Sequence, residues 1–347
     1  IGFEQLAAHV RPYTPEWVFL ETGIRPEVIR ETAREMGRAA PATIVHPGRH
    51  ATWYGDDTQR ARAVAILNAL LGSWNRKGGF YIPEKVSLPN YPLPEYPQPR
   101  SRTGDAYPGK WPFANQGVTN GVIEASIGED AYFKGWIVYA TNLPQTIPGF
   151  RKKLEAAADS LDLLVVVDTM PSEMTGYADV VLPECTYLER YDDLRNSAER
   201  SPSLALRMPA FEPLYESKPG WWMAKQLGER LDLGQYFPWQ DYSEKLDWQL
   251  KQVGSSLEEM QRVGVKNFPR KYPLYAPEGQ SIKFRTPSGK VELYSQQLAD
   301  KGFDPMPVYT TPESPPRGYY RLNYGRMPSH TFGKTVNNPL LFELAPE

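Results

Sequence analysis

A carboxylate that directly follows an apolar run is the first feature of this chain that could do chemistry. Residues 163–167 read LLVVV, and Asp168 and Thr169 come next. An unalternated, β-branched run is typical of a parallel strand that is covered on both faces. Open α/β sheets bind ligands at the carboxyl ends of such strands, so Asp168 and Thr169 are candidate ligand-binding residues. A turn former or a helix N-cap is the alternative role for Asp168, and the sequence leaves it open.

A second polar pair follows another apolar run in the same way. Residues 136–140 predict a strand, and Thr141 and Asn142 come directly after it. Because neighbouring parallel strands end at one edge of a sheet, these side chains should line the same crevice as Asp168. A nucleotide would fit there, although the GxGxxG and phosphate-loop lysine motifs of common NAD and ATP sites do not occur in the sequence. A simple loop cap is the alternative role for Asn142.

The third candidate site is an arginine flanked by two histidines, in residues 46–50, which read HPGRH. Gly48 would let the loop backbone approach a ligand, and Arg49 supplies a permanent planar cation that can hold an oxyanion or a sulfur-rich anion. The two histidines lack the third ligand and the helix that a zinc site needs. Arg49 and His50 are therefore candidate catalytic residues, with a structural ion pair and packing in a turn as their alternative roles.

A fourth cluster of small, basic and hydroxyl side chains lies near the end of the chain. Residues 325–331 read GRMPSHT and follow a strand predicted over 319–324. Backbone N–H groups and charge-assisted hydrogen bonds in such a loop can bind a pyrophosphate or the edge of a pterin. An ordinary loop is the alternative.

Helices and short apolar strands alternate around these candidate sites. The spacing predicts a helix that begins at Pro26, a strand over 42–45 and a helix over 57–71. Residues 81–113 are rich in Pro and Tyr and predict an extended connection between units. Further helices are expected near 117–127, 148–157 and 218–227 and within 241–265. This alternation predicts an α/β fold with parallel-sheet units and flanking helices.

Composition narrows the classes of function. The chain has 347 residues, of which 39 are basic and 41 acidic, and a formal net charge of -2. The near-neutral net charge therefore gives no overall electrostatic potential that would favour binding to nucleic acid or to an anionic membrane. No apolar run approaches the roughly 18 to 20 residues of a membrane span. Cys185 is the single cysteine, which excludes an intrachain disulfide and a multi-cysteine iron–sulfur site in these residues, and it is expected to be a small buried hydrophobe.

Residues 178–190, which read ADVVLPECTYLER, resemble the guanine-nucleotide-binding segment of the molybdopterin oxidoreductases, the dimethyl sulfoxide reductase superfamily. Further matching phrases, in the order of that family, are NALLG at 68–72, GG at 78–79, NLP at 142–144 and FRTPSGKVELY at 284–294. The motif PGRH at 47–50, together with WYGDDTQR at 53–60, is most similar to the polysulfide and thiosulfate reductase branch of this family.

The resemblance implies roles for the candidate residues. Asp168 and the basic Arg190 would contact one guanine dinucleotide of the cofactor, with Thr141, Asn142 and Thr169 beside them. Gly48 would lie against the cofactor, while Arg49 would bind the sulfur anion over the metal, with His50 as a second catalytic residue beside it. The residues of the C-terminal loop that the resemblance places on the pterin cofactor are Gly325, Arg326, Ser329, His330 and Thr331.

The implied enzyme reduces polysulfide or thiosulfate at molybdenum or tungsten held by two molybdopterin guanine dinucleotides, and the metal carries the redox chemistry. Tetrathionate, arsenate, nitrate, formate and sulfoxides are alternative substrates within the family. A cofactor-free structural subunit of a redox complex is the alternative from another class. The branch further implies a 4Fe-4S cluster on an N-terminal part, an iron–sulfur electron-transfer subunit, a quinone-binding membrane anchor and a periplasmic location.

Four parts are expected along the chain. They are an α/β unit with the Arg49 loop (1–80), the Pro-rich connection (81–113), an α/β guanine-dinucleotide-binding unit (114–280), and a connection with the truncated start of a C-terminal barrel domain (281–347). The first residue is Ile1, and the family's cysteine cluster, its metal-ligating residue and most of its barrel do not occur in the sequence. We therefore expect a middle fragment that is inactive by itself.

Overall fold

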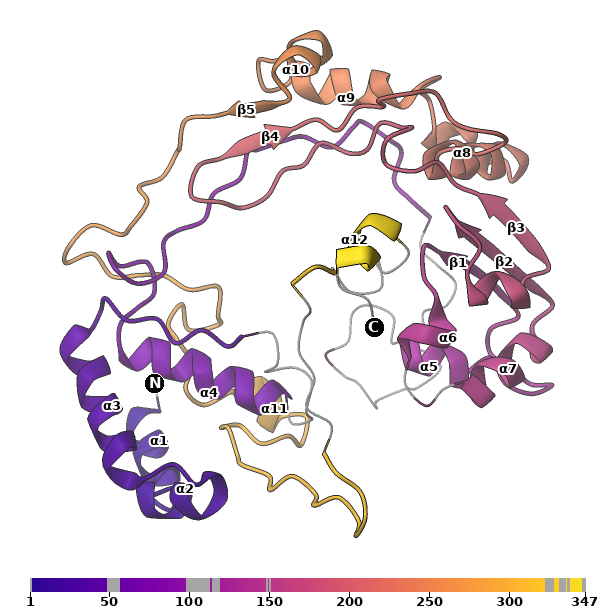
Figure 1. Ribbon diagram of the computed structural model, residues 1–347. Coiled ribbons are helices and arrows are strands. Elements are labelled where there is room, and N and C mark those ends of the chain that lie inside the picture. The colour runs from indigo at the N-terminus through magenta and orange to yellow at the C-terminus, as the bar shows by residue number, and fades with distance from the viewer. Residues whose placement is uncertain are drawn as a thin grey trace.

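The computed structural model describes residues 2–48, 57–97, 113, 119–147, 149, 151–321, 328–330, 335 and 338–344. The described elements form an arc (Figure 1). The N-terminal helices lie at one end of this arc and a parallel sheet lies at the other. The elements that connect them are β4 (Ser203–Ala205), β5 (Val265–Asn267), α9 (Tyr242–Lys251) and α10 (Leu257–Val263). The mixture of helices with a three-stranded parallel sheet confirms the predicted α/β class.

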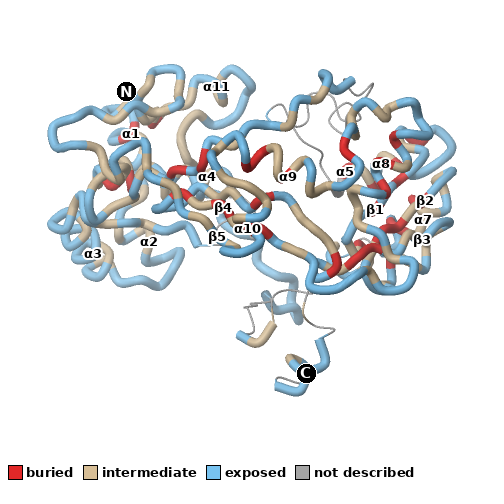
Figure 2. Tube along the Cα trace, turned by 90° about the horizontal axis from the view of Figure 1, so that it is seen from above, coloured by how far each residue is buried: buried red, intermediate tan, exposed pale blue. Residues whose placement is uncertain are grey.

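The N-terminal end is helical: α1 Phe3–His9, α2 Pro15–Thr22, α3 Pro26–Ala39 and α4 Asp57–Leu70. Pro26 begins α3 as predicted. Proline is tolerated in the first turn of a helix, because a backbone N–H there would have no acceptor within the helix. Thr14 caps α2 by accepting a hydrogen bond from the Trp17 N–H at 3.2 Å. Neither α2 nor α3 has a buried residue, and Figure 2 shows how exposed this end of the molecule is.

The strand predicted over 42–45 does not form. The Val45 N–H donates to Asn68 Oδ1 at 2.9 Å, Asn68 Nδ2 donates back to the Val45 carbonyl at 2.8 Å, and the Ser73 hydroxyl donates to the Thr43 carbonyl. Asn68 and Ser73 are buried. These side chains satisfy the backbone groups that a neighbouring strand would otherwise satisfy, so the segment has partners without joining a sheet.

The parallel sheet consists of β1 Gly135–Tyr139, β2 Leu163–Asp168 and β3 Val180–Pro183 in the order β1-β2-β3. Tyr139 pairs with Val167, and Asp168 pairs with Pro183. The elements around it are α5 Thr119–Glu124, α6 Leu143–Thr146, α7 Arg151–Ser160 and the 3-10 helix η3 Glu173–Tyr177. The two neighbouring parallel strands predicted from the apolar runs are therefore confirmed.

One face of this sheet carries its core. The buried residues there are Ile123, Trp136, Val138, Leu143, Leu154, Ala157, Leu164, Val166 and Met174, so α5, α6, α7 and η3 cover that face. On the other face Ile137 is 65% exposed, and Leu163 at the start of β2 is 46% exposed. Val167, at the carboxyl end of the run on this same face, is only 4% exposed. The prediction that residues 163–167 are covered on both faces therefore holds at the end of β2 and is wrong at its start, for the described part of the chain. The apolar run thus predicted the strand itself but not which elements cover its two faces.

A second core lies where the chain returns along the arc. Its buried side chains come from β4 Ser203–Ala205, from α9 Tyr242–Lys251 and α10 Leu257–Val263, and from the segments beside them. The strand β5 Val265–Asn267 pairs antiparallel with β4, and α8 Gly220–Arg230 and η4 Gly234–Tyr236 precede α9 in the chain. The predicted extended connection lies against this core: Asn196 bonds both the N–H and the carbonyl of Val86, at 3.0 and 2.8 Å, and Gln249 donates to the Pro89 carbonyl at 2.9 Å. These bonds hold the connection in place in its described part.

The C-terminal part contains α11 Gln296–Ala299 and α12 Pro339–Leu344. Of the strand predicted over 319–324, residues 319–321 are not in a strand and 322–327 lie outside the described residues. The barrel domain thus stays a prediction. Among the residues that the structure describes, no helix has the length and apolar character that crossing a membrane requires.

Candidate cofactor-binding site

The carboxyl ends of β1 and β2 bring the first two predicted site segments to one edge of the sheet. Because the strands are parallel and in register, Thr141 and Asn142 leave β1 beside the point where Asp168 and Thr169 end β2. The Thr169 N–H donates to Asp168 Oδ1 at 2.7 Å. Asp168 Oδ2 is then a further acceptor at the edge. Thr141 uses its hydroxyl locally, donating to the Tyr139 carbonyl at 3.0 Å.

Asn142 is held by an acidic residue from the next loop. Its Nδ2 donates to Glu173 Oε2 at 2.5 Å, and Gln145 Nε2 donates to Glu173 Oε1 at 2.9 Å. The hydrogen bond from Asn142 holds the pKa of Glu173 below its usual value. Asn142 Oδ1 and Ser172 Oγ are buried and have no hydrogen-bond partner among the described residues. Buried polar atoms are normally paired, so this edge fits a ligand that brings its own polar groups.

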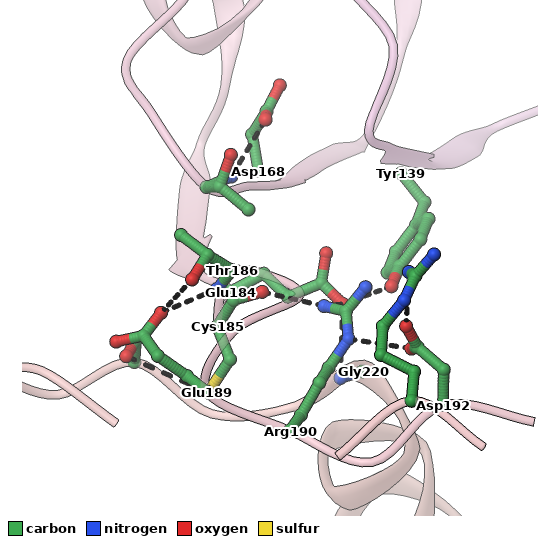
Figure 3. Close-up of polar contacts among 12 residues, drawn as sticks. Tyr139, Asp168, Glu184, Cys185, Thr186, Glu189, Arg190, Asp192 and Gly220 are labelled. Carbon is green, nitrogen blue, oxygen red and sulfur yellow. Dashed lines mark hydrogen bonds and ion pairs between the residues drawn. The ribbon is translucent and has the colours of Figure 1, made fainter. Parts of the chain in front are cut away.

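A buried ion pair lies in the segment that directly follows β3 (Figure 3). Arg190 Nη1 lies 2.5 Å from Glu184 Oε1 and 2.6 Å from the Cys185 carbonyl oxygen, and Arg190 Nε donates to Asp192 Oδ1 at 2.9 Å. The Glu184 side chain is only 2% exposed. Burial opposes the charge of Arg190, but the hydrogen bond to Asp192 and the attraction of Glu184 raise its pKa. In Figure 3 the Asp168 carboxylate points away from this cluster.

The same Glu184 oxygen accepts two further hydrogen bonds. The Tyr139 hydroxyl donates to Oε1, and so does the Gly220 N–H, at 3.2 Å. Burial, followed by the hydrogen bond to Glu184, raises the pKa of Tyr139 to about 12. A Cβ on Gly220 would lie 2.7 Å from the Tyr139 hydroxyl oxygen. Glu184 thus joins β1, the segment after β3 and the start of α8.

The loop that follows Glu184 is held by a second buried carboxylate. Glu189 Oε2 accepts from the Thr186 N–H and hydroxyl at 2.6 and 2.7 Å, and its Oε1 accepts from the Leu214 N–H at 2.7 Å. The hydrogen bond from Leu214 is the largest cause of the lowered pKa of Glu189. Cys185 is fully buried, as predicted, and burial raises the pKa of its thiol. This cysteine is a packing residue.

The remaining predicted site residues are only partly described. Gly48 has a φ of 63°, a left-handed conformation that suits glycine, and its N–H donates to His46 Nδ1 at 3.0 Å. Arg49 and His50 lie outside the described residues. In the C-terminal loop His330 contacts Thr335 at 3.4 Å through Nδ1, and Ser329 is half-buried. Gly325, Arg326 and Thr331 lie outside the described residues.

The structure therefore brings Thr141, Asn142, Asp168 and Thr169 together at one edge and places Arg190 in a separate, internally paired cluster. The sequence did not point to Tyr139, Glu173, Glu184 or Gly220. Glu184 lies within the phrase ADVVLPE and Glu173 lies between the two apolar runs, so both were visible as acidic residues. Their partners were not, because Tyr139 is 45 residues from Glu184 in the sequence and Asn142 is 31 from Glu173.

Comparison with known proteins defines the class to which this fold and site belong. Residues 38–230 match the family model of the molybdopterin oxidoreductases. The chain belongs to this family, which confirms the resemblance found in the sequence. The match covers the Arg49 loop, the sheet edge and the Glu184 cluster. Family membership implies a molybdopterin cofactor carrying molybdenum or tungsten.

Particular relatives extend along nearly the whole chain. The molybdopterin-containing subunit PhsA of the thiosulfate reductase of Salmonella typhimurium is 33% identical over an alignment of 385 positions, gaps included, which covers 99% of this chain and 50% of that protein. Acetylene hydratase of Syntrophotalea acetylenica is 28% identical, covering 90% of this chain and 46% of that protein. The chain spans about half the length of the curated relatives it matches.

A solved structure has the same fold. Acetylene hydratase from Pelobacter acetylenicus superimposes with a TM-score of 0.68 at 24% sequence identity, over 89% of this chain and 46% of that one. At this level of identity the likeness concerns the fold alone.

Proposed function

We propose that the full-length protein is a molybdenum- or tungsten-dependent oxidoreductase that reduces thiosulfate or polysulfide. The observation that supports this most strongly is the similarity to the thiosulfate reductase subunit PhsA, at 33% identity over 99% of the chain. The acetylene hydratase relative is less similar, at 28%. The wording around Arg49 points to the same branch of the family.

The cofactor form that we propose is the guanine dinucleotide. Asp168 Oδ2 and Asn142 Oδ1 are acceptors at the edge of the sheet. Guanine carries N–H donors at N1 and at its exocyclic N2 amine, and acceptors at a sheet edge would pair with them. Adenine has an unprotonated N1 at the position where guanine has its N1–H. That nitrogen is an acceptor, so it could not pair with an acceptor oxygen of the protein. The residues that would hold the guanine are therefore Asp168 and Asn142.

Arg190 would act from the other side of the same ligand. Its Nε and Nη1 groups donate to Asp192, Glu184 and Cys185, as described above. A guanidinium has five N–H donors, so the two of Nη2 are left for a pterin or phosphate oxygen of the cofactor. Glu184 and Asp192 fix the plane in which those donors lie.

Arg49 and His50 would act on the substrate. The bound cofactor supplies the two electrons that reduction needs. The guanidinium of Arg49 would bind the sulfur anion through charge-assisted hydrogen bonds and draw charge away from the S–S bond. Thiosulfate, two electrons and two protons give hydrogen sulfide ion and hydrogen sulfite, and His50 is our candidate for delivering a proton to the leaving sulfur.

The enzyme would work in a complex. The relative PhsA is named as a subunit of its reductase, which supports the idea that this protein has partner subunits. We propose an iron–sulfur electron-transfer subunit and a quinone-binding membrane anchor as partners, a 4Fe-4S cluster in the catalytic polypeptide, and a periplasmic location.

Turnover by the full-length holoenzyme tests this function. Oxidation of reduced viologen would be followed with thiosulfate, polysulfide, tetrathionate, dimethyl sulfoxide and arsenate, and acetylene hydration would be assayed in parallel. We expect the largest kcat/KM with thiosulfate or polysulfide. A preference for another acceptor would overturn the substrate, and hydration without viologen oxidation would overturn the redox reaction.

An Arg49→Ala variant tests the proposed substrate contact. Turnover should fall on the order of 100-fold, as for the loss of one charge-stabilising donor, while the metal content stays unchanged. Arg38→Ala, which removes an exposed arginine from the last turn of α3, is the matched control. Loss of metal from Arg49→Ala would assign the residue a structural role instead.

A further inference from the structure

Two buried polar atoms that have no hydrogen-bond partner among the described residues belong to neighbours of Glu173. Ser172 precedes it in the chain, and Asn142 reaches it from the loop after β1. Within the described residues, the only other buried side-chain atom of this kind is Trp239 Nε1, which lies between η4 and α9 and not at the sheet edge. Of the three buried side-chain groups that lack a partner in the described part of the chain, two therefore lie at this corner of the sheet edge.

Glu173 determines which way the Asn142 amide faces. A carboxylate can only accept hydrogen bonds, so the Asn142 group 2.5 Å from Glu173 Oε2 must be the NH2. The opposite orientation would bring two oxygens together at that distance. Gln145 occupies the other oxygen of Glu173 at 2.9 Å. Asn142 Oδ1 is thereby turned away from Glu173.

The backbone of Asn142 is fixed independently of its side chain. Its carbonyl accepts from the Gln145 N–H at 3.2 Å, the Thr146 N–H at 3.0 Å and the Thr146 hydroxyl at 2.9 Å. These bonds set the position of Cα and leave the side-chain torsions free. The contact with Glu173 is what restricts those torsions. It also joins the loop after β1 to η3, the 3-10 helix that follows β2.

We propose that Glu173 is a positioning residue, whose carboxylate holds the Asn142 amide so that Oδ1 accepts an N–H or O–H group of the cofactor's guanosine. The inference rests on the proposed guanine dinucleotide and adds a residue to its site. An amide aimed in this way accepts only, which favours a donor on the ligand. The lowered pKa of Glu173 keeps it ionised at neutral pH, as this role requires.

The experiment follows release of the nucleotide from the full-length holoenzyme. GMP freed by acid hydrolysis is quantified per chain after increasing times at a mildly elevated temperature, which gives a rate constant for cofactor loss. The variants are Glu173→Gln, Asn142→Ala and the double substitution. Glu129→Gln, which neutralises an exposed carboxylate of the same unit, is the matched control. Thermal unfolding of each apoprotein reports on structure alone.

We expect Glu173→Gln and Asn142→Ala each to speed GMP loss about fivefold, the effect of one hydrogen bond. The double variant should lose GMP no faster than Asn142→Ala, because Glu173 acts through Asn142. The inference would be overturned if the double variant lost GMP at a rate that multiplies the two single effects, or if Glu173→Gln lost GMP at the wild-type rate. It would also be overturned if the unfolding temperature of the apoprotein fell in step with the faster loss of GMP. A wild-type holoenzyme that releases no GMP would overturn the proposed cofactor form itself, which is a distinguishable result.

Discussion

The guanidinium of Arg190 and the carboxylate of Glu184 form an ion pair at 2.5 Å whose side chains are 18% and 2% exposed. The pair is not isolated, because Glu184 also accepts from Tyr139 on β1 and from Gly220 at the start of α8. One carboxylate oxygen thus connects three parts of the chain behind the sheet. Removing a partner would leave a charge buried, which costs more than the intact pair contributes.

Replacing Arg190 with alanine should therefore destabilise this region strongly. We expect the free energy of local opening to fall by about 3 kcal/mol or more. Hydrogen exchange of peptides that cover residues 180–190 in the full-length protein measures it. Arg207→Ala is the control, because the Arg207 side chain pairs with Asp192 but is 56% exposed. Its loss should cost about 1 kcal/mol at most. Equal effects of the two substitutions would contradict a buried pair.

The hydroxyl of Tyr139 should make stability depend on alkaline pH. Its pKa is raised from 10.0 to about 12 by burial and by Glu184, so the folded state binds this proton more tightly than the unfolded state. The contribution is complete below pH 10.0 and is lost as the pH rises toward 12. Tyr139→Phe should remove this part of the alkaline loss, measured as the urea midpoint against pH. Parallel curves for the two proteins would contradict the hydrogen bond.

A methyl group at Gly220 should disturb the same cluster sterically. The added Cβ would lie 2.7 Å from the Tyr139 hydroxyl oxygen and 3.0 Å from Glu184 Oε1. We expect Gly220→Ala to lower the free energy of unfolding by about 1–3 kcal/mol. Gly37→Ala is the matched control: apart from its chain neighbours and the backbone of α3 itself, no atom lies within 4 Å of the added Cβ. It should stabilise the protein by up to about 1 kcal/mol, and the opposite order of the two variants would contradict this packing.

Acid should loosen the loop that Glu189 holds. The N–H groups of Leu214 and Thr186, with the Thr186 hydroxyl, lower the pKa of this carboxyl below 4.5. Its contribution is therefore present above pH 4.5 and is lost as the pH falls through the folded-state pKa. Glu189→Gln should be destabilised at neutral pH and lose less on acidification, by urea midpoint. Glu212→Gln, at an exposed position, should follow the wild type.

The sequence predicted correctly those elements whose signals lie within a short stretch of residues. Pro26 at the start of α3 and the two apolar runs of β1 and β2 are of this kind, and so is the edge at which Asp168 and Asn142 meet. The strand over 42–45 failed because Asn68, 23 residues beyond Val45, supplies its hydrogen bonds. Glu184 was noted as part of the segment at 178–190 but was given no role for the same reason, since its partner Gly220 is 36 residues away. Side-chain partners at such separations leave no pattern in a single sequence.

The central claim is that the edge formed by β1 and β2 binds the guanine nucleotide of a molybdopterin cofactor. The most direct measurement is molybdenum, tungsten and GMP content of the natively purified full-length protein and its Asp168→Ala variant, with Asp162→Ala as the exposed control. The wild type and control should carry metal and GMP. Asp168→Ala should bind the nucleotide about 10-fold more weakly or worse, as when a hydrogen bond to a charged group is lost, and should retain less GMP. Metal-free wild type, or an Asp168→Ala variant with full GMP content, would contradict the claim.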